Sequence, residues 1–313
     1  VGMYFSEDYE LVGQVPNYFS RDHFIQFLTV RNPQDRLILN KEARIFTKRE
    51  WFTGFSTMLE FRRRELSSAG AWNFERVEDI GGESQVRDVN NIVSSEISLG
   101  VRFAYRENFV EGEFTRVSLG STWPILNVRL DLGMKGVLDS DYQYQKLTMS
   151  ATDKIPLGPL GTVQYNVEGG KTWQDLPYPL QFIHSGNESF FYNSQAFNTM
   201  NFFEFVSDEY VSFRAEHHFE GFFLNKIPLF QKLKWREIVG VNAIYGTFDE
   251  SNFDELVLPD RTFILNDGPY AEAYLGVENI FRFFRVDAIW RLTYRDKPNT
   301  QNFGVLLGFD IKF

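Results

Sequence analysis

Large apolar side chains occupy every second position at the end of the chain. In "FGVLLGFDIKF", residues 303, 305, 307, 309, 311 and 313 are Phe, Val, Leu, Phe, Ile and Phe. A period of two places alternate side chains on opposite faces of a β-strand. The chain therefore ends in a strand with one apolar face.

The same alternation recurs along the chain and predicts an all-β fold of about twelve strands. It is clearest in residues 97–105, 126–134, 211–219 and 285–295. Weaker copies occupy 36–48, 52–65, 114–122, 142–154, 161–173, 235–248 and 270–280. Helical periodicity is nearly confined to "FFLNKIPLFQKLKW", residues 222–235.

Alternation alone also fits a soluble β-sandwich or barrel, but two features favour a membrane barrel. Several of these stretches run to ten or more residues, which is the length a tilted strand needs to cross a bilayer. Their polar faces carry full charges of both signs, while their other faces are apolar and aromatic. A membrane barrel turns its apolar side chains towards lipid and lines its lumen with polar ones.

Composition is consistent with this class of protein. Aromatic residues make up 17% of the chain, and the mean hydropathy is -0.30, as expected where apolar and polar residues alternate. The net charge of -10 disfavours a nucleic-acid partner, and the lack of cysteine excludes disulfides and thiolate chemistry. Since the chain starts at Val1, we expect a mature form or a fragment.

We therefore predict an antiparallel transmembrane β-barrel over residues 1–313. In such a barrel the last strand must pair with the first, because an unpaired edge in lipid is costly. The end of the chain also resembles the C-terminal signal that the insertion machinery of bacterial outer membranes recognises. This resemblance assigns an insertion role to Phe309, Ile311 and Phe313.

If Phe313 lies on the periplasmic side, the parity of the strands assigns every connection to one end of the barrel. The predicted outer connections are 174–209, 249–268 and 296–301. The predicted inner connections are 66–92, 157–161, 222–234 and 279–284, of which 66–92 is unusually long for that side.

The outer segment 174–209 is too apolar for a solvated loop. We expect it to fold over or into the barrel mouth and to restrict conduction, burying a set of aromatic residues: Phe182, Phe190, Phe191, Tyr192, Phe197, Phe202, Phe203 and Phe205.

Charged residues on the predicted inner face form the main candidate site. The basic members are Arg44, Arg62, Arg102, Arg129, Arg214, Arg285 and Arg291. The acidic members are Glu42, Glu60, Glu96, Asp131, Glu168, Glu216, Glu272 and Asp287. Because the signs are mixed, we expect mutual pairing that fills and stiffens the interior, with a selective pore as the alternative.

Histidines offer two weaker candidates. The chain has His23, His184, His217 and His218, but His217 and His218 point to opposite faces of a strand, which disfavours a shared metal ion. His184, Ser185 and Asn187 could form a hydrolase triad, but they lie in a predicted loop without rigid support. We therefore predict no metal, no cofactor and no enzymatic activity.

Three stretches resemble a Bacteroidota outer-membrane family of unknown function, whose full members carry a carboxypeptidase-regulatory-like domain before a large barrel. They are residues 16–40, 201–240 and 276–298. The resemblance implies that the chain is the C-terminal part of a longer protein. The strand layout also resembles the sixteen-stranded barrels of BamA type, which assemble membrane proteins or secrete polypeptides.

In BamA-type barrels a long loop separates the eleventh and twelfth strands, and counting back from Phe313 places 174–209 at that loop. Their Val-Arg-Gly-Phe/Tyr signature is absent from the segment, so the resemblance implies the architecture and leaves the assembly function open. On this count roughly four strands would precede Val1.

From these features we predict a non-enzymatic protein of the bacterial outer membrane. It would act in transport, in the assembly of other membrane proteins, or as a subunit of a surface complex. The alternatives are a phospholipase-like hydrolase and a simple pore. The expected partners are the lipid bilayer, lipopolysaccharide, the insertion machinery and other outer-membrane or surface proteins.

Overall fold

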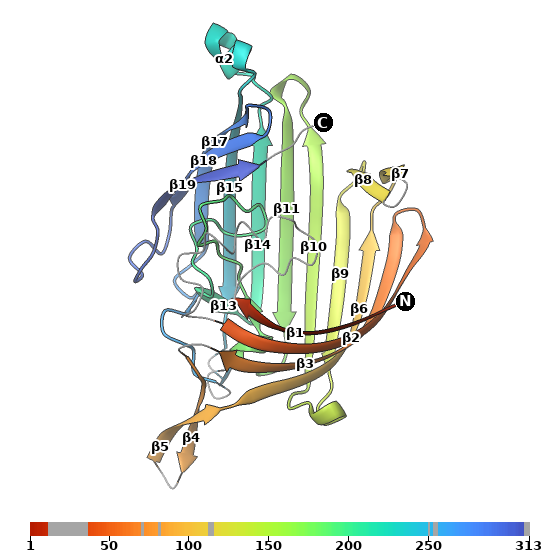
Figure 1. The fold of residues 1–313 in the computed structure, drawn as a ribbon, viewed down its shortest axis with the longest axis vertical. Coiled ribbons are helices and arrows are strands. Elements are labelled where there is room, and N and C mark those ends of the chain that lie inside the picture. The colour runs from red at the N-terminus through yellow and green to blue at the C-terminus, as the bar shows by residue number, and fades with distance from the viewer. Residues whose placement is uncertain are drawn as a thin grey trace.

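The computed structural model contains one large antiparallel sheet of twelve strands, which curves around an inner face (Figure 1). It describes residues 1–11, 37–69, 72–80, 83–111, 116–249, 251–252 and 256–309. In sheet order the strands are β1 (Gly2–Leu11), β2 (Leu37–Phe52), β3 (Phe55–Ala69), β6 (Asn91–Phe103), β9 (Ile125–Gly133), β10 (Tyr144–Pro156), β11 (Thr162–Thr172), β14 (Glu209–His218), β15 (Arg236–Thr247), β17 (Tyr270–Ile280), β18 (Phe284–Arg291) and β19 (Phe303–Phe309).

Smaller elements lie in the connections between these strands. They are the hairpins β4 (Phe74–Ile80) with β5 (Glu83–Val89) and β7 (Asn108–Glu111) with β8 (Arg116–Gly120), the three-stranded sheet β12 (Phe182–Ile183), β13 (Phe205–Ser207) and β16 (Phe263–Ile264), four 3-10 turns, and the short helix α2 (Pro228–Leu233). The predicted amphipathic piece 222–235 contains α2, none of whose residues is buried. Among the described residues, no helix has the length and apolar character to span a membrane.

The predicted all-β, antiparallel architecture is confirmed, although one predicted strand is wrong. Within the predicted strand 114–122, residues 116–120 form β8, which does not join the large sheet and pairs only with β7 in a separate hairpin. The twelfth strand is instead β1, which pairs with β2 from Gly2 to Leu11. Its alternation was missed because Glu7 interrupts the apolar series of Met3, Phe5 and Tyr9.

Removing the false strand also corrects the side assigned to residues 66–92. Phe74 and Trp72 pack on Tyr178 of the segment between β11 and β14, with ring centroids 6.1 and 6.2 Å apart. The Val257 amide, from the connection between β15 and β17, donates to the Glu75 carbonyl at 2.8 Å. The β4–β5 connection therefore lies at the same end as the predicted outer connections, opposite to the end that the sequence indicated.

The outward face of the sheet carries a continuous apolar surface. The alternating apolar residues, which we predict to face lipid, lie on this face: Leu99, Phe103, Leu132, Phe213 and Phe309 are exposed, and Val101, Leu130, Val286 and Ala288 are partly exposed. Ile311 lies outside the described residues, as does Phe313. Soluble monomers rarely expose apolar patches larger than a few hundred Å², so this surface fits a lipid environment.

The predicted closure of the barrel is not found among the described residues. β1 and β19 are the two edges of the large sheet, and no ladder joins them. The edge of β19 is instead contacted at Leu307 by residues 190–192, which lie between β12 and β13. Part of the edge's hydrogen-bonding capacity is thus satisfied by the chain itself.

Candidate functional site: the segment inside the barrel

Residues 173–208, which we call the inner segment, connect β11 to β14 and pack on the inner face of the large sheet (Figure 1). Most of its large apolar side chains are buried: Leu176, Tyr178, Leu180, Phe182, Phe197, Met200, Phe202, Phe203, Phe205 and Val206. The prediction that this part of the chain folds back on the barrel is confirmed. Its effect on conduction stays a prediction.

Phe190 departs from that pattern, since 50% of its surface is exposed. Its predicted burial is wrong because the residue contacts the barrel through its backbone. The Phe190 carbonyl accepts a hydrogen bond from the Leu307 amide at 3.0 Å. The Tyr192 amide donates to the Leu307 carbonyl at 2.7 Å, and the Phe191 ring stacks on Phe309 at 5.7 Å. The inner segment thus adds a short parallel strand to the edge of β19.

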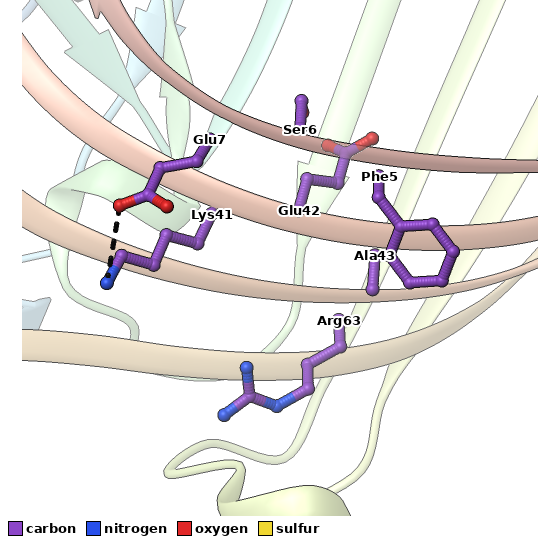
Figure 2. Close-up of a pocket in the computed structure, with 7 residues that line it drawn as sticks. All are labelled: Phe5, Ser6, Glu7, Lys41, Glu42, Ala43 and Arg63. Carbon is purple, nitrogen blue, oxygen red and sulfur yellow. Dashed lines mark ion pairs between the residues drawn. The ribbon is translucent and has the colours of Figure 1, made fainter.

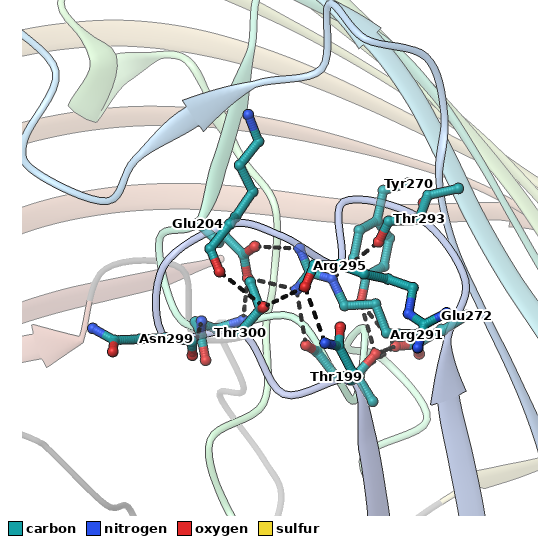
Figure 3. Close-up of polar contacts among 12 residues, drawn as sticks. Thr199, Glu204, Tyr270, Glu272, Arg291, Thr293, Arg295, Asn299 and Thr300 are labelled. Carbon is teal, nitrogen blue, oxygen red and sulfur yellow. Dashed lines mark hydrogen bonds and ion pairs between the residues drawn. The ribbon is translucent and has the colours of Figure 1, made fainter.

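An ion pair between Arg291 of β18 and Glu204 anchors the inner segment to the wall (Figure 3). Arg291 Nη2 lies 2.5 Å from Glu204 Oε1, and Nη1 lies 3.1 Å from Oε2. Nη1 also donates to the Thr199 carbonyl at 3.1 Å. Because removing one partner of a buried ion pair costs about 3–5 kcal/mol, this contact holds the segment firmly.

Glu272 of β17 forms a second anchor beside the first (Figure 3). This fully buried carboxylate accepts from the backbone amides of Asn198 and Thr199 at 2.8 and 2.9 Å. It also accepts from the Thr199 hydroxyl at 2.8 Å and from Asn242 Nδ2 at 2.8 Å. These donors replace the water that the carboxylate loses on burial.

Tyr192 carries the inner segment into a polar network on β14, β17 and β18. Its hydroxyl lies 3.2 Å from Glu216 Oε2 and 3.0 Å from the Tyr274 hydroxyl. The Arg285 guanidinium lies 4.0 Å from the centroid of the Tyr192 ring, a distance typical of a cation–π contact.

The wall side of this network consists of ion pairs. Arg285 pairs with Glu216 at 2.5 Å and with Asp287 at 2.6 Å. His218 Nε2 lies 2.7 Å from Glu216, and its Nδ1 lies 3.1 Å from Glu278. His217 points to the other face and stacks on Phe219 at 3.9 Å, as the strand geometry predicts.

Most of the other predicted inner-face arginines also lie beside carboxylates. Arg44 pairs with Glu42 at 3.6 Å and Glu60 at 3.7 Å, Arg62 pairs with Glu96, Arg102 pairs with Glu107 at 2.6 Å, and Arg129 pairs with Glu60 at 2.9 Å and Asp131 at 2.7 Å. Glu168 instead accepts from the Tyr210 hydroxyl at 2.5 Å. Arg214 forms no ion pair within 4 Å among the described residues, and its guanidinium lies 4.8 Å from the centroid of the Phe197 ring.

The predicted Ser-His-Asn set is not joined by hydrogen bonds among the described residues. His184 Nε2 lies 2.9 Å from the Ser207 hydroxyl, whereas Asn187 bonds to Ser189 and to the Asn198 side chain. Burial, together with the cations Arg214 and Lys146, lowers the pKa of His184 to about 3. The histidine therefore serves as a neutral packing residue of the inner segment in this arrangement. His23 lies outside the described residues.

A hollow of about 410 Å³ over β1 and β2 is a weaker candidate (Figure 2). Glu7 and Lys41 form an ion pair of 3.5 Å across these strands, with 63% and 45% of their side chains exposed. Exposed pairs of this kind contribute about 0–1 kcal/mol. The ion pair at this hollow is therefore weaker than the buried pair that holds the inner segment.

Sequence reasoning missed Glu204, which lies within the apolar run "NFFEFV". A single acidic residue among phenylalanines that must be buried requires a buried cation or other hydrogen-bond donors, and this was a usable signal. Its partner, Arg291, was correctly assigned to the inner face, but the two residues are 87 positions apart. No local pattern connects them.

Comparison with known proteins identifies the family. The model of a family described as "Family of unknown function (DUF5686) C-terminal domain" matches residues 36–258, which is well over half of the chain. The chain belongs to the DUF5686 family. The family resemblance expected from the sequence is thereby confirmed. No curated protein matches this DUF5686 chain.

Among solved structures, the DUF5686 chain is similar to a crystal structure of BamA from Haemophilus ducreyi that lacks POTRA domains 1–3. The TM-score is 0.54 and the sequence identity 13%, with 88% of this chain and 55% of the BamA chain covered. The DUF5686 chain thus spans about half the length of that protein. At this identity the likeness establishes a shared β-barrel fold.

Proposed function

We propose that the protein is a non-enzymatic β-barrel of the bacterial outer membrane that handles polypeptides at the edge of its sheet, in assembly or export. The observation that carries the proposal is the pairing at Leu307. Both backbone hydrogen-bonding groups of this residue engage an extended stretch, residues 190–192. Adding a strand to an exposed edge is a general way to bind an extended polypeptide.

Two further features support this function over a simple pore. The inner segment occupies the barrel's inner face and is anchored there by Glu272 and Arg291. The fold resembles that of BamA, and the BamA-type barrels that the strand layout resembles act on polypeptides. The lipid bilayer and lipopolysaccharide would surround the apolar outer face. The insertion machinery would recognise the C-terminal strand.

The test uses an engineered disulfide to hold residues 190–192 against β19. The chain has no cysteine, so the double variant Phe191→Cys, Leu307→Cys introduces one defined pair at directly opposed positions. The full-length protein carrying this pair would replace the wild type in its native cell. Quantitative proteomics would then compare the outer-membrane and surface proteins under oxidising and reducing conditions.

We expect the oxidised double variant to lose specific outer-membrane or surface proteins, and the reduced form to restore them. Each single cysteine variant is the matched control and should resemble the wild type. An unchanged proteome with a fully formed disulfide would contradict the proposed role of the edge. A loss of small-molecule uptake without any change in the proteome would favour transport.

A further inference from the structure

A cavity of about 580 Å³ lies between the inner segment and the wall formed by β10, β11 and β14. Its lining is rich in uncharged hydrogen-bonding groups, which include Thr152, Gln164, Asn166 and Ser185. The ring of Tyr274 contributes an aromatic surface. A cavity of this size suits a small ligand, since ligand sites typically measure roughly 300–1,000 Å³.

Arg214 is the cation among the residues that line the cavity, which also include the carboxylates Glu168 and Glu216. It differs from Arg44, Arg62, Arg129 and the other inner-face arginines described above, each of which has a carboxylate partner. Arg214 forms no ion pair and no hydrogen bond with any described residue. Glu216, which also lines the cavity, is engaged by Arg285 at 2.5 Å and by His218 at 2.7 Å. Glu168 accepts from the neutral Tyr210 hydroxyl and keeps its negative charge, which attracts Arg214 without forming a direct ion pair.

Two buried polar atoms beside the cavity have no partner among the described residues. They are Nε of Arg214, a donor, and Oδ1 of Asn166, an acceptor. The two residues are direct partners across β11 and β14. Buried polar groups are nearly always paired in native proteins, so this donor and this acceptor are available to a bound molecule or to water.

We propose that this cavity binds a small anionic polyhydroxylated molecule, such as a sugar acid or a sugar phosphate. The Arg214 guanidinium would bind the carboxylate or phosphate, because its planar donors match these groups. The amide and hydroxyl side chains of Asn166, Gln164, Thr152 and Ser185 would bind the hydroxyl groups. This site is separate from the edge at Leu307 and does not depend on the proposed work on polypeptides.

The test is calorimetric titration of the full-length protein in detergent with four probes. Glucuronate and glucose 6-phosphate carry both the anion and the hydroxyl groups, glucose lacks the anion, and acetate lacks the hydroxyl groups. We expect one or both anionic sugars to bind at least about tenfold more tightly than glucose or acetate. The stronger of the two identifies the anionic group as carboxylate or phosphate.

Three variants assign the binding to Arg214. Arg214→Gln should weaken binding at least about tenfold. Asn166→Asp places a carboxylate beside the guanidinium within a nearly identical side chain, so it should also abolish binding while retaining the fold. Arg236→Gln removes the same charge from the exposed pair with Glu220, outside the cavity, and should bind like the wild type.

The Asn166→Asp variant decides the matter if Arg214→Gln does not fold. The proposal would be overturned if neither anionic sugar bound, if glucose bound equally well, or if folded Asn166→Asp retained full affinity. An equal loss of affinity in Arg236→Gln would also overturn it, since the effect would then reflect net charge alone.

Discussion

Arg291 and Glu204 meet through two hydrogen bonds, of 2.5 and 3.1 Å, although they are 87 residues apart in the chain. Arg291 lies at the end of a wall strand, and Glu204 belongs to the segment that packs on the inner face. Their side chains have 0% and 1% of their surface exposed. The large sheet and the inner segment are thus joined by an ion pair that is buried from water.

Breaking this pair on one side should loosen the inner segment. We expect Arg291→Met and Glu204→Gln each to lower the free energy of unfolding by about 3–5 kcal/mol, because each leaves a buried polar group unpaired. The double variant Arg291→Met, Glu204→Gln should lose less than the sum of the two single variants. Urea titration in lipid vesicles measures these differences.

The exposed pair of Lys171 and Glu209, at 2.6 Å, provides the control for that experiment. Lys171→Gln should cost less than about 1 kcal/mol, since solvent screens the pair. Strictly additive losses in the Arg291 and Glu204 variants would show that the two side chains do not act together.

The sequence predicts the large sheet well because a strand in lipid must alternate at nearly every position. Leu99 and Phe213, for example, lie on the outward face that their parity indicates. Prediction failed where alternation has another cause or is interrupted. Residues 116–120 of the predicted strand belong to the small hairpin of β7 and β8, and Glu7 interrupts the pattern of β1.

The packing of the inner segment is harder to predict, because it depends on contacts between residues that are far apart in the sequence. The phenylalanines around Glu204 indicate burial, yet they do not say which wall residue meets the carboxylate. Likewise, Arg214 and Arg129 have the same strand pattern in sequence. Only the three-dimensional arrangement separates the unpaired Arg214 from Arg129, which lies 2.7 Å from Asp131.

If the outward apolar face contacts lipid, charged substitutions on it should lower the stability of the protein. Leu130→Arg and Phe309→Arg should each destabilise the protein in lipid by about 2–4 kcal/mol if their positions lie near the middle of the bilayer. Gln164→Arg, on the inner face and exposed to the cavity, is the matched control and should cost much less. Equal effects of all three variants on urea unfolding in vesicles would disprove the assignment of the faces.

His184 should make the inner segment sensitive to acid. Its pKa is about 3 when packed, well below the ordinary value of 6.5. Above pH 6.5 the histidine is neutral in both packed and released states, so it contributes no pH dependence. As the pH falls from 6.5 towards 3, only the released state takes up the proton, and packing weakens by about 1.4 kcal/mol per pH unit.

Hydrogen exchange of the backbone amides in residues 173–208 measures this effect. After correction for intrinsic exchange rates, the wild type should open more at pH 5 than at pH 7, by about 2 kcal/mol. His184→Gln should remove that difference, leaving the smaller response of the carboxylates. An identical pH response in the two proteins would exclude His184 as its source.

The central structural claim is that the inner segment fills and restricts the barrel. The most direct test is the single-channel conductance of the full-length protein in a planar bilayer, compared with a variant in which residues 187–201 are replaced by a Gly-Ser linker of equal length. We predict low conductance for the wild type and a several-fold larger, stable conductance for the variant. Unchanged conductance in a variant that folds and inserts normally would contradict the claim.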